Sequence, residues 1–185
     1  MNVSGNAFVK LNLLKGLAVK SLIGINQYSY AQRDINFVEV AAAERGTYDG
    51  LNDNAGNGLN WTWTNTIEYG LVTGQHNFKV IAGSEAYDNN SFSTAASRQQ
   101  FPFKDVNYIT LNTGLRSIGN SSGQSAYSLF SLFGRINYTF ADKYLLEAVV
   151  RRDGSSRFGT EKYGIFPAFS AGWRVSEEAF MASTK

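Results

Sequence analysis

Apolar and polar residues alternate with a period of two along most of this chain. The clearest run covers residues 130–140, where even-numbered positions are almost all apolar and odd-numbered positions are mostly polar. A period of two is that of a β-strand with one apolar face. The pattern predicts about seven strands and no long helix, with a single helical turn at 176–181. The strands are expected within residues 8–14, 17–30, 60–69, 78–87, 130–140, 144–153 and 168–175.

The links between these strands are alternately short and long. Short links are expected at 15–16, 73–75 and 141–143, and long loops at 36–59, 88–125 and 153–164. In an antiparallel up-and-down meander, this order puts the short turns at one end of the sheet and the long loops at the other. Bacterial outer-membrane barrels have this asymmetry, with strands of about 9–11 residues crossing the bilayer. The long loops at 36–59 and 88–125 are expected to be the least ordered parts.

Composition supports a sheet whose outer face need not contact water. Charged residues make up 17% of the 185 residues, against about 25% in soluble domains, and aromatic residues reach 14%. The chain has no cysteine and one histidine, which excludes a disulfide scaffold and a histidine metal cluster. We expect no metal, no cofactor and, with a net charge of +2, no nucleic-acid partner.

Seven strands do not close a bacterial outer-membrane barrel, because such barrels have even strand numbers from eight upward. Open sheet edges are not tolerated in hydrocarbon, since their backbone groups would have no hydrogen-bond partners. The N-terminal residues also lack the pattern of a signal peptide. We therefore expect residues 1–185 to be an open segment of a larger transmembrane β-barrel.

The C-terminal third contains an ordered series of motifs. They read LFGRINY at 132–138, DKYLL at 142–146, RDGSSRFG at 152–159, GIFP at 164–167 and AGWRVSEE at 171–178. This series resembles the SusC/RagA-type TonB-linked outer-membrane transporters of Bacteroidetes. A looser similarity extends through WTWTNT at 61–66 and GQHNF at 74–78 to KGL at 15–17.

The resemblance implies a part of a 22-stranded barrel that encloses an N-terminal plug. Residues 1–185 would be barrel wall only, with the plug, the TonB box and the signal peptide absent. The implied function is TonB-energised import of large nutrients across the bacterial outer membrane. The implied partners are outer-membrane lipids, a SusD-like surface lipoprotein, TonB through the missing N-terminal part, and a glycan or peptide substrate.

Polar residues at the predicted inner face and loops are candidates for ligand contact, because arginines and carboxylates suit polar ligands. These candidates are Arg135, Glu147, Arg151, Asp153 and Arg157. The structural alternative is a strand-to-loop corner in which Gly154 has a positive φ and Asp153 pairs with an arginine. No catalytic residue is expected, since the one possible histidine base, His76, follows a tight turn and is interpreted as an exposed turn residue.

Aromatic residues near the strand ends are candidates for the girdles that line membrane interfaces. They are Trp61, Trp63, Tyr69, Tyr138, Phe140 and Tyr144. Two other readings of the whole chain stay open. One is a soluble all-β carbohydrate-binding module, in which Trp61 and Trp63 would stack on sugars; the other is a small eight-stranded outer-membrane barrel.

Overall fold

Strands form nearly all of the computed structural model, which describes residues 1–38 and 48–184. In this part of the chain, the elements follow in the order β1 (Asn2–Leu14), β2 (Leu17–Asn36), β3 (Gly50–Thr73), β4 (His76–Gln99), β5 (Arg116–Phe140), β6 (Tyr144–Ser155), β7 (Tyr163–Trp173), and the 3₁₀-helices η1 (Val175–Glu177) and η2 (Ala179–Thr184). No helix among the described residues is long and apolar enough to cross a membrane.

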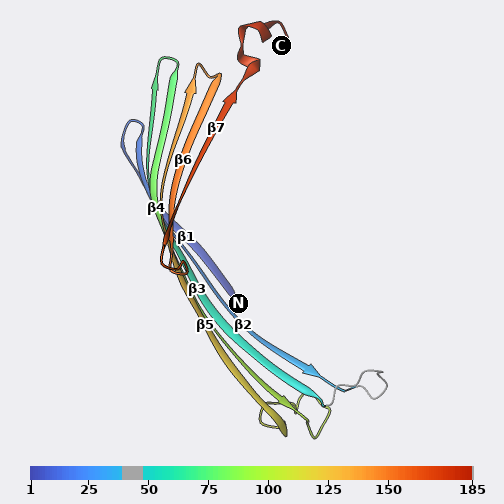
Figure 1. The fold of residues 1–185 in the computed structure, drawn as a ribbon. Coiled ribbons are helices and arrows are strands. Elements are labelled where there is room, and N and C mark those ends of the chain that lie inside the picture. Colours follow the sequence, from blue (N-terminus) through green and yellow to red (C-terminus); the bar gives the residue numbers. More distant parts are fainter. Residues whose placement is uncertain (39–47, 185) are drawn as a thin grey trace. The chain divides into compact units, whose positions relative to one another are not determined.

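The strands form one sheet in strict chain order, from β1 at one edge to β7 at the other (Figure 1). Strand β5 pairs with β6, and β6 with β7, in antiparallel orientation. The predicted seven-stranded open meander is thus confirmed. The chain divides into two compact units, and strands β1 to β5 contribute residues to both. The first unit contains residues 1–4, 26–60 and 89–126, and the second contains residues 5–25, 61–88 and 127–185.

The long loops are shorter than the sequence predicts. Strand β3 already begins at Gly50, β4 continues to Gln99 and β5 begins at Arg116. The links in these places are therefore 37–49 and 100–115, and the third long link is 156–162. The prediction failed because these strand extensions are rich in Gly, Ser and Asn and lack an apolar face. The expectation of low order at 36–59 falls partly on residues 39–47, outside the described residues.

The short turns lie where they are predicted, and they are neighbours in the second unit. The N–H of Gly70 donates to the carbonyl oxygen of Gly16 at 2.8 Å, and the N–H of Ala141 donates to that of Gln75 at 2.8 Å. Gly16 and Gly74 both have a positive φ, of 81° and 57°. Glycine adopts this conformation without the steric cost that a Cβ brings.

The first unit has a small core of its own. Leu51, Phe101 and Ile109 are buried, and Ile35 and Leu111 pack against them. The loop 100–115 supplies most of this cluster. Its conformation is fixed by the Thr113 hydroxyl, which donates to the carbonyl oxygens of Tyr108 and Thr110 at 2.8 and 3.0 Å. The link 100–115 is therefore folded against β2 and β3.

In the second unit, the segment after β7 is attached to the β5–β6 turn by one carboxylate. Glu178 accepts hydrogen bonds from Lys143 Nζ at 2.9 Å, Tyr144 Oη at 2.8 Å and Trp173 Nε1 at 3.1 Å. The expected helical turn at 176–181 takes the form of η1 and η2, and Arg174 precedes η1 without a side-chain capping bond.

The two turn glycines provide a matched test of the fold. A Cβ at Gly16 would overlap the carbonyl oxygen of Gly70, whereas a Cβ at Gly74 would meet nothing within 4 Å. Gly74→Ala should therefore cost only the left-handed strain, about 1–2 kcal/mol. Gly16→Ala should cost clearly more, measured as the free energy of unfolding of the complete protein from lipid vesicles. Equal penalties would contradict the described approach of Gly16 to β3.

The Glu178 contacts predict a pH dependence. The hydrogen bond from Lys143, then those from Tyr144 and Trp173, lower the pKa of Glu178 from 4.5 to about 2. A pKa lowered by folding adds stability that is fully present above pH 4.5 and is lost as the pH falls toward 2. The stability difference between the wild type and Glu178→Gln should therefore shrink over this window. The control is Glu161→Gln in the link 156–162. The expectation would be contradicted if the difference in unfolding free energy between the wild type and Glu178→Gln stayed constant from pH 4.5 down to about 2.

Candidate functional site

The strand register puts the polar candidates of the second unit on one face of the sheet. Ser131 lies opposite Asp153, Phe133 opposite Arg151, and Asn137 opposite Glu147. Directly opposed residues of an antiparallel pair project from the same face. The odd-numbered positions of β5 and β6 therefore form a common polar face.

Arg151 is the centre of a polar network on this face. Its Nε donates to Asp153 Oδ1 at 2.6 Å, and its Nη2 donates to Glu85 Oε1 at 3.1 Å and to Ser131 Oγ at 2.9 Å. The Thr64 hydroxyl extends the network to β3 by donating to Glu85 Oε2 at 3.2 Å. One guanidinium thus bonds to side chains of β4, β5 and its own strand β6, and Glu85 connects it to β3.

A second cluster lies closer to the short turns. Arg135 Nε donates to Asn137 Oδ1 at 2.7 Å and lies 3.0 Å from Glu147 Oε2, and Asn137 Nδ2 also donates to Glu147. Arg157 belongs to neither cluster. Its guanidinium lies 4.2 Å from the ring centre of Tyr127, and its backbone N–H donates to Ser155 Oγ.

The structure thus joins Arg151 with Asp153 and Arg135 with Glu147. Asp153 pairs with an arginine, as in the structural alternative, but it lies within β6, and Gly154 lacks the positive φ that this alternative expected. Glu85, Ser131 and Thr64 are not among the candidates predicted from the sequence. Their positions in the period-two pattern could have placed them on the polar face, but the contact of Glu85 with Arg151 across β5 depends on the strand register.

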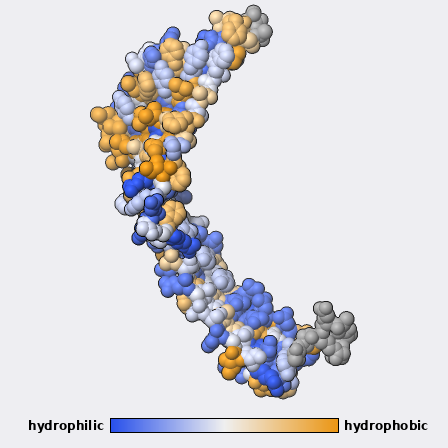
Figure 2. All heavy atoms as spheres, viewed as in Figure 1, coloured by the Kyte–Doolittle hydropathy of each residue, from blue (hydrophilic) through white to orange (hydrophobic). Residues whose placement is uncertain are grey.

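The opposite face of β5–β7 is apolar and uncovered in the described structure. Ile136 lies opposite Ala148, which lies opposite Phe169, and the next row contains Tyr138, Leu146 and Ala171. Ile136 is 49% exposed and Phe169 is 81% exposed. In Figure 2, hydrophobic residues gather over the part that contains β6 and β7. Contiguous exposed apolar surface of this kind marks a site that contacts lipid or another protein.

Aromatic rings border this apolar face at its short-turn side. The ring centres of Phe78 and Tyr138 are 4.7 Å apart, those of Phe140 and Tyr144 are 6.3 Å apart, and those of Tyr144 and Trp173 are 6.5 Å apart. His76 is exposed, as expected, but it has a partner: its Nδ1 lies 2.8 Å from Tyr138 Oη. The sequence analysis did not include His76, Phe78 and Trp173 in this row.

The remaining girdle candidates lie on β3. Tyr69 is 44% exposed. Trp63 donates from Nε1 to Ser21 Oγ at 2.9 Å, and Trp61 lines an open hollow with Phe130, Tyr163 and Lys162. At this end of the apolar face, the guanidinium of Arg152 lies 4.0 Å from the ring centre of Tyr163.

Comparison with known proteins finds relatives along the whole chain, although no protein-family profile matches it. TonB-dependent receptor P39 of Formosa agariphila is 30% identical over 187 residues, which cover 95% of this chain and 17% of the relative. TonB-dependent receptor SusC of Bacteroides thetaiotaomicron is 43% identical over 126 residues, covering 62% of this chain and 11% of SusC.

Solved structures agree on the fold. The RagAB peptide transporter matches with a TM-score of 0.81 and 20% identity, over 97% of this chain and 20% of the matched chain. The RagAB peptide importer in its 'open-open' state matches with a TM-score of 0.78 and 22% identity, over 92% and 19% of the two chains. The chain thus spans about a fifth or less of the proteins it matches. It belongs to the SusC/RagA-type TonB-dependent receptors and forms a segment of their β-barrel wall.

Proposed function

We propose that the complete protein is a TonB-energised importer of large nutrients, glycans or peptides, in the bacterial outer membrane. These 185 residues serve as barrel wall. The observation that carries the proposal is the opposite chemistry of the two faces of β5–β7. One face is apolar and uncovered, and the other carries the Arg151 and Arg135 clusters. A barrel in a membrane needs this division, because its outside contacts hydrocarbon and its lumen is wet.

The length of the apolar face supports a membrane position. On β6, it is bordered by Tyr144 at the short-turn side and by Arg152, stacked on Tyr163, at the other side. The eight residue steps between them span about 27 Å along the strand, or about 20 Å across a bilayer at a tilt of about 40°. This approaches the apolar band of about 25 Å that outer-membrane barrels present. The aromatic rows, including Trp61, Trp63, Tyr69, Tyr138, Phe140 and Tyr144, would lie at the two interfaces.

The polar face would line the lumen and provide contacts to the substrate. Arg135, Glu147, Arg151 and Asp153 already satisfy one another through ion pairs, so the face presents charge without an isolated buried ion. Arg157 would contribute from beside Tyr127. Each carboxylate of these clusters is held by a guanidinium, which leaves no free acid or base for catalysis. We therefore assign the polar face to binding, with no enzymatic step and no cofactor.

The partners follow from the family. The matched structures are those of the RagAB peptide transporter and importer, and the relative SusC is a TonB-dependent receptor. For this chain, we propose a SusD-like lipoprotein over the outer opening and TonB acting through another part of the protein. A soluble carbohydrate-binding module is disfavoured, because no second layer of the described structure covers Ile136, Leu146 and Phe169.

Arginine substitutions at two adjacent positions test the assignment of the faces. Ile136→Arg should cost about 2–4 kcal/mol of folding free energy if Ile136 lies near the bilayer midplane. Asn137→Arg should cost far less, since a charge on the lumen face stays hydrated or pairs with Glu147. Both values are measured by unfolding the complete protein from lipid vesicles. An equal or larger penalty at Asn137 would mean that the faces are reversed or that the sheet is not a barrel wall.

Uptake measurements test the transport function itself. Deleting the complete gene from the producing bacterium should abolish accumulation of labelled oligosaccharides or of labelled oligopeptides. A protonophore should abolish the same accumulation in the wild type, because TonB draws on the proton gradient. Accumulation that persists after deletion, or that does not respond to the protonophore, would contradict energised import by this protein.

A further inference from the structure

Two tyrosine rings of the first unit occupy the space over glycines of the neighbouring strand. A Cβ added to Gly58 would lie 2.5–2.6 Å from atoms of the Tyr28 ring, and one added to Gly56 would lie 2.7–2.8 Å from atoms of the Tyr30 ring. Both glycines are buried, whereas Tyr28 is half-buried and Tyr30 is 47% exposed. Each tyrosine therefore fills the space over a glycine of β3 and keeps part of its side chain exposed.

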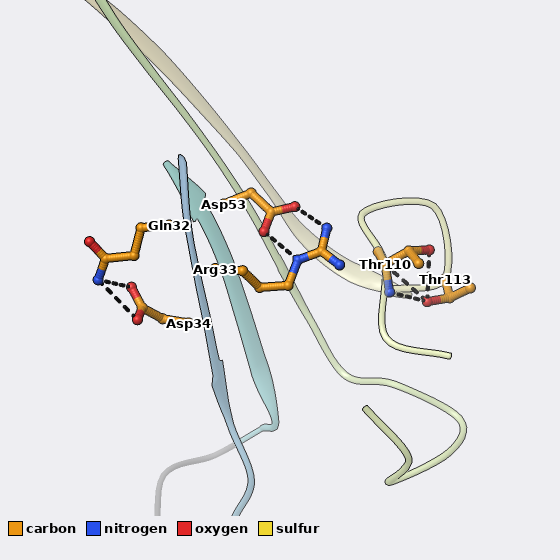
Figure 3. A network of polar contacts seen from close by, with 6 residues as sticks. All are labelled: Gln32, Arg33, Asp34, Asp53, Thr110 and Thr113. Atoms are coloured by element: carbon orange, nitrogen blue, oxygen red, sulfur yellow. Dashed lines mark hydrogen bonds and ion pairs between the residues drawn. The ribbon is translucent and has the colours of Figure 1, made fainter. Parts of the chain in front are cut away.

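This tyrosine face is the side of the strands that the core of the first unit leaves open. Leu51 of β3 belongs to the core, and Asp53 pairs with Arg33 through bonds of 2.7 and 2.8 Å. Along β3, Gly56 and Gly58 alternate with these odd-numbered positions and so project to the other side. Figure 3 shows the same division on β2, where Gln32 and Asp34 lie on the side opposite Arg33.

Hydroxyl and amide groups lie on the neighbouring strands β3 and β4. Asn60, next but one to Gly58, accepts a hydrogen bond from Asn89 of β4. Farther across the sheet, Ser93 Oγ lies beside Gly123 and Ser97 Oγ lies beside Gly119. These hydroxyls fill the space over a glycine of the next strand, as the two tyrosines do on β3.

The tyrosine rings, the asparagine amides and the serine hydroxyls are all uncharged. Asp34 of β2 contributes a carboxylate on this side, and Gln32 donates to both of its oxygens. The uncharged groups suit an uncharged ligand.

This chemistry matches a neutral sugar. The C–H groups on one side of a pyranose ring carry small positive partial charges, and the face of an aromatic ring is negative, so the two stack. Sugar hydroxyls both donate and accept, and they match asparagine amides and serine hydroxyls, which also do both. A rigid tyrosine loses little conformational entropy on binding, and less still when its ring is already held against a glycine.

We propose that Tyr28 and Tyr30 form a stacking platform for a neutral oligosaccharide. Residues two apart on a strand are about 7 Å apart, so the two rings can contact neighbouring sugars of one chain. This inference rests on the proposed import function and selects glycans as its substrate class. Tyr28 and Tyr30 are binding residues here, and Gly56 and Gly58 are positioning residues that set the plane of the rings.

Binding to an array tests the platform with the complete protein in detergent. The array presents neutral oligosaccharides, acidic oligosaccharides and oligopeptides, and the neutral oligosaccharide with the strongest signal is then titrated by calorimetry. Tyr28→Leu and Tyr30→Leu should each weaken its binding roughly three- to tenfold, the size expected for one lost aromatic contact. Tyr28→Phe should bind nearly as the wild type, since it keeps the ring.

Gly58→Ala gives a second perturbation that keeps both tyrosines. Its methyl group would displace the Tyr28 ring and should weaken binding of the same oligosaccharide. Tyr108→Leu is the matched control, because Tyr108 is an exposed tyrosine of the loop 100–115 and should not affect binding. Heat-dependent migration of the folded barrel in gels verifies that each variant compared has folded.

Two results would overturn the platform. The first is that no neutral oligosaccharide on the array binds the protein. The second is that the folded variants Tyr28→Leu, Tyr30→Leu and Gly58→Ala bind the oligosaccharide as tightly as the wild type. The rings would then have only a structural role over the glycines. Either result, combined with energised uptake of oligopeptides, refutes the platform and leaves the import function standing. Loss of all energised uptake refutes the import function itself.

Discussion

Strand pairing is the interaction on which the rest of this structure depends. Each strand obtains its backbone hydrogen bonds from its neighbours in chain order, and in hydrocarbon these bonds have no substitute. Once the backbone is satisfied in this way, side chains must alternate between two faces. The Arg151 network and the apolar rows around Ile136 are consequences of that alternation in β5 and β6. A shift of one residue in register would exchange the two faces and leave Arg151 in the apolar row.

The polar face shows how charge is held on a sheet. Arg151 bonds to Asp153, two positions along its own strand, and to Glu85, which lies on β4 beyond β5. Few residues can do this, because a planar guanidinium offers several donors in fixed directions. Lysine could replace the charge of Arg151 but not its simultaneous contacts with β4, β5 and β6. The arginine at position 151 therefore contributes the geometry of its donors as well as its positive charge.

The sequence predicted those parts of the fold in which one face of a strand is continuously apolar. Residues 130–140 and 144–153 are examples, and the short turns followed from Gly16 and Gly74. The sequence did not predict the strand extensions around Gly56, Ser93 and Gly123, because their order comes from pairing between strands and leaves no hydrophobic period. Contacts across an intervening strand, such as Glu85 with Arg151, depend on register, which a single sequence does not reveal.

Glycine has a particular role in those extensions. A glycine in a strand normally weakens it, because it adds flexibility and gives neighbouring side chains nothing to pack against. Here, the space above Gly56 and Gly58 is filled by Tyr30 and Tyr28, so the missing side chain is replaced by a ring from the neighbouring strand. Larger residues with a high strand propensity would stabilise β3 locally but would push the rings off the sheet. The choice of glycine at these positions therefore favours an aromatic surface over local strand stability, which is the pattern expected when a surface is kept for binding.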